Sequence, residues 1–260
     1  MNARSAWAAV SLALGLLATA ALSMGGTPSL AAEDAAGDAP SSREILRQMS
    51  ETLKAAQRIH FHAEISFDEL AAPGLLLQLA GATDVELRRA DGFRIDYRDD
   101  ISAKTVWYDG KTLSLLDRGH GLYASAAAPP TVDEAIDQFE RNYGLTLPLA
   151  DLLAGDPYER MLARAVHGTY AGLHDVEGVP CHHLAFAQDD LDWEIWIEKG
   201  EVPVPRKLLF RYTQEPGSPQ YTAVLMDWNL AAKLSPATFT PEVPDAAVAV
   251  EFLEIEEVPR

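Results

Sequence analysis

The sequence is poor in cysteine and in positive charge, and both shortages restrict what the protein can be. Its single cysteine, Cys181, cannot form an internal disulfide bond, so burial of apolar side chains has to stabilise the fold. The chain holds 21 Lys and Arg residues against 39 Asp and Glu residues, which gives a net charge of −18. Nucleic-acid binding and attachment to anionic membranes both need basic clusters. We therefore expect no nucleic-acid partner and no electrostatic adhesion to a membrane.

Long uninterrupted apolar segments are also missing, and the nearest approach to one lies at the N-terminus. Arg4 precedes a mostly apolar segment over residues 6–23, no acid occurs before Glu33, and small residues lie at Ser29 and Ala31. A positive start, an apolar middle and a small-residue exit are typical of a secretory signal peptide. The alternative is an uncleaved membrane anchor, but the apolar segment is shorter than the roughly 20 residues that a membrane helix needs.

We predict three parts along the chain: a signal peptide over residues 1–31 that is cleaved near Ala31, a flexible leader over residues 32–42, and a single domain over residues 43–260. Cleavage removes one arginine and no acid, so the mature chain is more negative still, and high net charge favours solubility. No cysteine near the cleavage site offers a point for lipid attachment. We therefore expect a soluble monomer with no stable membrane insertion after cleavage.

Two hydrophobic periods alternate along the mature chain. Apolar residues at helical spacing predict four helices, over residues 41–57, 131–144, 147–154 and 157–165. Two of these starts have capping-box spacing, Ser41 with Glu44 and Thr131 with Glu134. Alternation with a period of two, bounded by turn residues, predicts strands over 58–69, 75–79, 83–89, 93–98, 104–108, 112–117, 122–126, 166–173, 179–188, 192–198, 206–213, 221–230 and 248–254. Short turns between consecutive strands predict an α+β fold with a curled antiparallel sheet and helices on its open side.

One face of the predicted strands is strongly apolar and rich in aromatic residues. It comprises Phe61, Ile65, Phe67, Phe93, Ile95, Tyr97, Trp193, Ile195, Ile197, Leu208, Phe210, Tyr212, Val224, Met226 and Trp228. Such residues ordinarily form a filled core. A large curled sheet can instead enclose an apolar ligand, and these residues would then line the cavity. The hydrophobic pattern is the same in both cases, so both interpretations stay open at this point.

Residues with the chemistry of a metal or catalytic site are few. Cys181 and His183 share one face of a predicted strand, and His60 and His62 share a face of another. A zinc site usually has three or four protein ligands, so we interpret Cys181 as a buried thiol and the imidazoles as solvent-facing, with no metal or cofactor. Nucleophile elbows, phosphate-binding glycine loops and HExxH motifs are not found. We predict a protein without enzymatic activity, with an enzyme whose site is assembled from distant residues as an alternative.

Several segments resemble a known family. They are Val106–Thr112, Cys181–Phe186, Asp192–Ile197, Pro205–Leu208, Met226–Trp228 and Phe239–Pro241. Together with the signal peptide, they are similar to a family of predicted periplasmic proteins that is itself similar to the lipoprotein carriers LolA and LolB and the sensor RseB. The resemblance covers most of Ile45–Phe252. It implies an unclosed half-barrel of about eleven antiparallel strands with helices over its mouth and an apolar interior.

The resemblance also implies a function. In the carriers the interior holds lipoprotein acyl chains, and a buried arginine helps to tie the lid shut; Arg94, Arg98 and Arg206 are the candidates here. We therefore predict a periplasmic binding or carrier protein for a lipid, an acyl chain or a lipidated protein. The alternative is a regulatory or sensor module that acts on another envelope protein.

Overall fold

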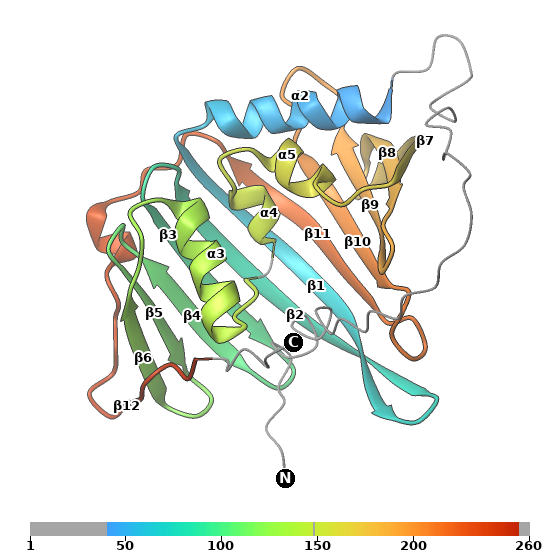
Figure 1. Ribbon diagram of the computed structural model, residues 1–260. Coiled ribbons are helices and arrows are strands. Elements are labelled where there is room, and N and C mark those ends of the chain that lie inside the picture. The colour runs from blue at the N-terminus through green and yellow to red at the C-terminus, as the bar shows by residue number, and fades with distance from the viewer. Residues whose placement is uncertain (1–40, 148, 255–260) are drawn as a thin grey trace, which may run out of the picture.

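The computed structural model describes residues 41–147 and 149–254, so the predicted signal peptide and most of the leader lie outside the described residues. Within these residues twelve strands form one sheet, in the order β12-β6-β5-β4-β3-β2-β1-β11-β10-β9-β8-β7. All neighbours are antiparallel except β12, which runs parallel to β6. The sheet does not close, because β12 and β7 remain at its edges (Figure 1). The predicted α+β half-barrel is confirmed, with twelve strands instead of about eleven.

Two antiparallel meanders make up the sheet, and they join where the first strand pairs with the eleventh. The first comprises β1 (Arg58–Ala72), β2 (Leu75–Arg88), β3 (Gly92–Asp99), β4 (Ala103–Tyr108), β5 (Thr112–Asp117) and β6 (Leu122–Ala127). The second comprises β7 (His167–Val176), β8 (Val179–Ala187), β9 (Leu191–Glu198), β10 (Pro205–Tyr212) and β11 (Gln220–Asn229), and the short β12 (Val248–Ala249) follows. The contact between β1 and β11 therefore holds the two meanders in one sheet.

The helices gather on the concave side of the sheet (Figure 1). They are α2 (Ser42–Ala55), α3 (Val132–Tyr143), α4 (Ala150–Leu153) and α5 (Pro157–Leu162). The 3₁₀ helix η2 (Pro236–Phe239) lies instead on the convex side, where the Phe239 ring packs against Arg88. The Thr131 hydroxyl accepts the backbone N–H of Glu134 at the start of α3, and Gly144 ends this helix with a φ of 63°. Apolar faces of α2 and α3 pack against the inward strand residues in one continuous core. The helices thus cover the open side of the curled sheet, as predicted.

Four local features differ from the sequence prediction. Segments 75–79 and 83–89 form the single strand β2, because Gly81 lets the backbones of β2 and β3 approach: a Cβ there would lie 2.6 Å from the Arg98 carbonyl oxygen. The third predicted helix shrinks to α4, since Leu149 has a φ of 58° and cannot continue a helix. The side chain of Ser41 makes no capping hydrogen bond, and Glu44 instead pairs with Arg47. The last predicted strand, 248–254, is reduced to the two residues of β12.

The alternation of β11 is shifted by one residue from the prediction. Tyr221, Ala223 and Leu225 face the core, whereas Val224 packs in a small cluster on the convex face. Met226 lies on the same side of the strand as Val224, so the expectation that both line the interior is wrong. At Asp227 the backbone adopts a φ of 56° beside a register shift against β1. This bulge returns Trp228 to the interior, where it stacks on Phe61 with ring centroids 4.5 Å apart.

Candidate ligand-binding cavity

A row of aromatic side chains crosses five neighbouring strands on the concave face. Direct cross-strand partners are Phe186 with Trp193, Trp193 with Phe210, Phe210 with Tyr221, and Tyr221 with Phe67. The rings of Phe186 and Trp193 stack with centroids 4.2 Å apart, and those of Phe210 and Tyr221 lie tilted at 6.2 Å. Aromatic cross-strand pairs stabilise a sheet and present a large apolar surface. The row therefore forms a rigid aromatic floor under the short helices.

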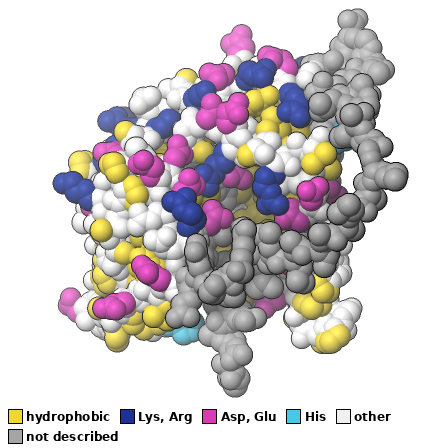
Figure 2. All heavy atoms as spheres, in the orientation of Figure 1, with side chains coloured by type: hydrophobic (Ala, Val, Ile, Leu, Met, Phe, Trp, Pro, Cys, Tyr) yellow, Lys and Arg dark blue, Asp and Glu magenta, His cyan; other side chains and the backbone are white. Residues whose placement is uncertain are grey.

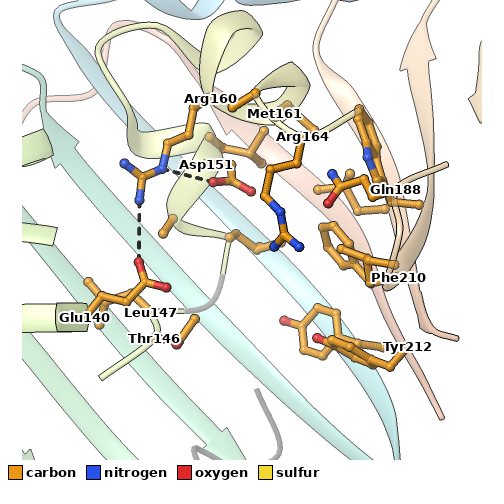
Figure 3. Close-up of a pocket in the computed structure, with 18 residues that line it drawn as sticks. Glu140, Thr146, Leu147, Asp151, Arg160, Met161, Arg164, Gln188, Phe210 and Tyr212 are labelled. Carbon is orange, nitrogen blue, oxygen red and sulfur yellow. Dashed lines mark hydrogen bonds and ion pairs between the residues drawn. The ribbon is translucent and has the colours of Figure 1, made fainter. Parts of the chain in front are cut away.

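A cavity of about 390 Å³ lies between the middle of this row and the helices α4 and α5 (Figure 3). Its apolar lining consists of Leu147, Leu149, Ala150, Leu152, Met161, Ala163, Leu191, Trp193, Leu208, Phe210, Tyr212 and Tyr221. Polar groups are fewer: Glu140, Thr146, Asp151, Arg160, Arg164 and Gln188. Ligand sites are typically concave, mostly apolar, and roughly 300–1,000 Å³ in volume, with a few polar groups that fix the ligand. The cavity has this character and lies at the small end of the range.

Arg160 ties the three helices that surround the cavity. Its guanidinium group lies 2.8 Å from the carboxylate of Asp137 in α3 and 3.0 Å from that of Asp151 in α4, with Glu140 of α3 at 3.8 Å. The dashed lines in Figure 3 mark two of these contacts. Burial disfavours the charge, yet the hydrogen bonds to Asp137 and Asp151 raise the pKa of Arg160. These ion pairs join α5 to α3 and to α4.

Arg164 follows α5 and points toward the wall formed by Phe210 and Tyr212 (Figure 3). Its guanidinium group binds both carboxylate oxygens of Asp190, at 2.7 and 2.8 Å. Asp190 lies in the turn between β8 and β9, so this pair joins the helical cover to the sheet. The Arg164 side chain is 58% exposed, and exposed ion pairs contribute little to stability. The contact is therefore suited to opening.

A third arginine, Arg89, joins the helical cover to the end of β2. It donates from Nε to the carbonyl of Ala56 at 3.2 Å and from Nη1 to the carbonyl of Ala154 at 2.6 Å. These carbonyls lie just after α2 and α4, so one side chain joins both helix ends. Its third nitrogen, Nη2, is buried without a hydrogen-bond partner among the described residues, and burial lowers the pKa of Arg89. Sequence reasoning missed this residue because Arg88-Arg89 reads as the polar end of a strand.

The three arginines proposed from the sequence lie elsewhere. Arg94 and Arg98 alternate with inward residues of β3 and face the convex side, where Arg94 pairs with Asp96 at 2.7 Å. Arg206 pairs with Glu198 at 2.6 Å, also away from the interior core. None of these candidates reaches the helical cover: alternation places Arg94 and Arg98 on the outer face, and the register shift between Pro205 and Lys207 turns Arg206 outward.

The predicted ligand-binding residues fall into three groups. Trp193, Leu208, Phe210 and Tyr212 line the cavity. The interior core contains Phe61, Ile65, Phe67, Phe93, Ile95, Tyr97, Ile195, Ile197 and Trp228, none of which lines the cavity. Met226 lies on the convex side. Sequence reasoning missed Tyr221, although its spacing from Ala223 and Leu225 carries the signal, and it also missed the helical residues that cover the cavity. A role of any of these residues in binding remains a prediction.

Cys181, His174 and His183 lie on the convex face, apart from the cavity. Cys181 is fully buried, and burial raises the pKa of its thiol to about 11. The imidazole of His183 stacks on the Trp196 ring with centroids 3.9 Å apart. Its Nε2 atom lies 2.8 Å from a carboxylate oxygen of Glu194, and its Nδ1 atom lies 2.8 Å from Nδ1 of His174. Its side chain is only 13% exposed, so the expectation of a solvent-facing imidazole is wrong for this residue. Across residues 41–147 and 149–254, no group of three or more His, Cys, Asp or Glu residues could hold a metal ion.

Comparison with known families assigns the chain to one of them. The family model described as "Predicted periplasmic protein (DUF2092)" matches residues 42–253. The chain belongs to this family. The match confirms the resemblance to predicted periplasmic proteins that the sequence segments indicated. No curated protein matches this family member. None of the helices in the described part of the chain is long and apolar enough to span a membrane.

Several solved structures share the general shape. The lipoprotein LppX of Mycobacterium tuberculosis is 11% identical, with a TM-score of 0.45, over 75% of this chain and 98% of that one. A LolA superfamily protein from Nitrosomonas europaea is 10% identical, with a TM-score of 0.39, over 78% and 99%. MucB from the Pseudomonas aeruginosa MucA/MucB complex is 12% identical, with a TM-score of 0.32, over 74% and 58%. At these scores no shared function follows from the likeness.

Proposed function

We propose that this protein is a periplasmic binding or carrier protein that holds the apolar chain of a hydrophobic ligand in the cavity between α4, α5 and the aromatic row. The observation that carries this proposal is the cavity itself, about 390 Å³ in volume and lined mainly by leucine and aromatic side chains. Burial of an acyl chain against such a surface is favourable by about 0.8 kcal/mol per CH₂ group. The ligand class is a lipid, a free acyl chain or the acyl chain of a lipidated protein.

The cover of the cavity is built to be released. Helices α4 and α5 have four and six residues, too few to bury a long apolar stripe of their own. Side chains of Arg160, Arg164 and Arg89 hold them to α3, to the sheet and to α2. Loss of these polar contacts would loosen the cover, which then depends on the apolar packing of Leu152, Leu153 and Met161 in the core. A protein that takes up and releases a ligand needs such a local opening.

The direct test is ligand content and uptake. The protein purified from the cells that produce it should carry co-extracted lipid detectable by mass spectrometry, and it should bind the neutral fluorescent probe N-phenyl-1-naphthylamine saturably. Ala150→Trp would fill the cavity and should abolish uptake, whereas the matched control Ala126→Trp, on β6, should retain it. If the unsubstituted protein carries no lipid and takes up no probe, the proposed function is wrong.

A second function is favoured by one specific observation. The hairpin of β1 and β2 extends beyond the rest of the sheet (Figure 1), and its leucines are exposed: Leu70 by 45%, Leu75 by 53% and Leu77 by 49%. An exposed apolar tip is typical of a surface that contacts another protein. A regulatory role would then act through an envelope protein. Crosslinking in whole cells should give a reproducible partner that is lost in the variant Leu75→Lys/Leu77→Lys, and a partner that survives these substitutions would count against this tip.

A further inference from the structure

Two hydrogen-bond donors are buried at the cavity without partners. Trp193 is 2% exposed and Tyr221 is 8% exposed, and both line the cavity. The indole Nε1 of Trp193 and the hydroxyl of Tyr221 have no hydrogen-bond partner among the described residues. Buried polar atoms in proteins nearly always have partners, because an unpaired one costs free energy. An acceptor atom supplied by a ligand would pair with these donors.

A comparison with Trp107 shows that the cavity is the decisive part of this observation. The Nε1 atom of Trp107 is also buried without a hydrogen-bond partner among the described residues, but Trp107 does not line this cavity. Its ring lies 5.9 Å from the guanidinium carbon of Arg94 on the convex side of the sheet. An unpaired indole alone therefore indicates no ligand. Trp193 and Tyr221 differ because they border one cavity from β9 and β11, on either side of Phe210 in β10.

The charges around the cavity argue against an anionic ligand. Both arginines of the lining are already matched by carboxylates: Arg160 by Asp137 and Asp151, and Arg164 by Asp190. Glu140 adds a further carboxylate. Acidic and basic side chains intermingle over the face that carries the helices (Figure 2), and the whole chain has a net charge of −18. An anionic head group would have to displace a carboxylate from its arginine in a negative field.

We propose that the ligand is an uncharged amphiphile whose polar end points inward, where an ester or amide oxygen accepts hydrogen bonds from Trp193 and Tyr221. This inference rests on the proposed function and adds the chemical class and the orientation of the ligand. An indole N–H can only donate, so the ligand group beside Trp193 has to be an acceptor. The leucines of α4 and of the segment before it would then contact the apolar chain.

The protonation state of the cavity phenols agrees with this assignment. Burial raises the pKa of Tyr212 to about 12, and it raises the pKa of the more deeply buried Tyr221 as well. Both phenols therefore stay protonated throughout the physiological range, and the hydroxyl of Tyr221 remains a donor. Binding of a neutral ligand should accordingly not vary between about pH 6 and pH 9.

Three probes with the same chain length test the proposal by displacement of N-phenyl-1-naphthylamine. Methyl laurate has a neutral ester, laurate has an anionic head, and dodecane has no acceptor. We expect methyl laurate to bind on the order of tenfold more tightly than dodecane, because its oxygens pair with buried donors. We also expect methyl laurate to bind more tightly than laurate at neutral pH.

Variants that each remove one hydrogen-bond donor locate the contact. Tyr221→Phe should weaken methyl laurate binding on the order of five- to tenfold and leave dodecane binding unchanged. Trp193→Phe should have the same selective effect. Because the Tyr221 hydroxyl has no hydrogen-bond partner among the described residues, Tyr221→Phe should not lower the thermal midpoint of the free protein. Tyr123→Phe removes a hydroxyl from β6, far from the cavity, and should change neither affinity.

The outcomes separate this inference from the proposed function. If the fluorescent probe binds but the three ligands compete equally, or if Tyr221→Phe weakens dodecane as much as methyl laurate, the inward polar end is wrong and the cavity remains a binding site. Tighter binding of laurate than of methyl laurate would overturn the neutral class. Failure of the probe and of all three ligands to bind would remove the proposed function, and this inference with it.

Discussion

The two meanders of the sheet use the same alternation of apolar residues but fill their concave faces differently. The twelve-residue helix α3 lies over the first meander (Figure 1) and buries Ile136 and Phe139. The ring centroids of Phe139 and Phe252 lie 5.4 Å apart. Over the second meander, α4 and α5 are short, and the cavity lies beneath them. In this protein the cavity lies under the short helices α4 and α5, whereas the longer helix α3 covers a packed core.

The physical reason lies in the chain between residues 144 and 157. Leu149 has a positive φ, and the Gly155-Asp156-Pro157 segment divides the helical region, so no helix there exceeds six residues. Asp156 caps α5 by accepting the backbone N–H of Glu159 at 3.2 Å. Short helices bury few side chains each and depend on polar contacts for their position. The second meander is therefore the part of the molecule that can open.

The largest expected effect breaks the packed side of this comparison. Phe93 is fully buried and lies 5.2 Å from the ring of Tyr108. Phe93→Ala should lower the free energy of unfolding by about 3–5 kcal/mol in urea titrations, because it leaves a cavity in a filled core. Phe210→Ala, at a half-buried position beside the existing cavity, should cost clearly less in stability and should alter probe uptake instead. Equal costs would contradict the contrast between the two meanders.

A smaller effect concerns the cover of the cavity. Arg160→Ala removes hydrogen bonds to Asp137 and Asp151 and should cost about 1–3 kcal/mol. Hydrogen exchange should become faster in α4 and α5, while β3 and β4 stay protected. Arg141→Ala, at an exposed position of α3, is the control and should change neither stability nor exchange. Uniform acceleration over the whole sheet would show that the cover is not a separate unit.

The smallest effects are pH dependences of opposite sign on the two meanders. In β1, burial opposes the charge of His62, but Asp84 at 2.9 Å and Glu64 at 3.3 Å raise its pKa overall. A raised folded-state pKa gives stability that is present below about pH 6.5 and is lost as the pH rises through the folded pKa. His62→Gln should therefore lower the unfolding free energy at pH 5.5 by less than about 1 kcal/mol, and not at pH 8.5.

The pH dependence of stability has the opposite sign at His183 in β8. Burial lowers the pKa of His183 in spite of Glu194, so the unfolded chain takes up this proton first as the pH falls below about 6.5. Acidification from pH 7.5 to pH 5.5 should accordingly destabilise the protein through His183, and His183→Gln should reduce that loss. Urea titrations at the two pH values measure both variants. An unchanged pH slope in His183→Gln would contradict the assignment.

The sequence predicted the packed meander better than the cavity. Clean alternation from Ile59 to Phe67 specified the inward face of β1, and Asp109-Gly110 specified the turn between β4 and β5. The register of β11 was missed because a single positive φ at Asp227 shifts the alternation, and no residue type announces such a bulge. The cavity could not be predicted, since an apolar pattern does not record whether the space between helix and sheet is filled.

Arg89 illustrates the remaining gap between sequence and structure. Its partners are backbone carbonyls at Ala56 and Ala154, and any residue supplies a carbonyl, so the sequence contains no sign of the contact. Tyr221 is the opposite case, because its alternation with Ala223 and Leu225 was visible and only the choice between two possible registers was wrong. The sequence pattern shows which side chains share a face of a strand, as for Tyr221. Contacts with backbone carbonyls, as for Arg89, are seen only in the folded structure.

The most direct measurement follows the indole N–H signals of the protein by nuclear magnetic resonance during a titration with methyl laurate. Within the described part of the chain, the Nε1 atoms of Trp193 and Trp107 are both buried without a hydrogen-bond partner, but only Trp193 lines the cavity. Single Trp→Phe variants assign the two signals. The signal of Trp193 should move downfield as its N–H gains an acceptor, while that of Trp107 stays in place. A titration that shifts both signals equally, or that saturates without moving Trp193, would contradict ligand binding in this cavity.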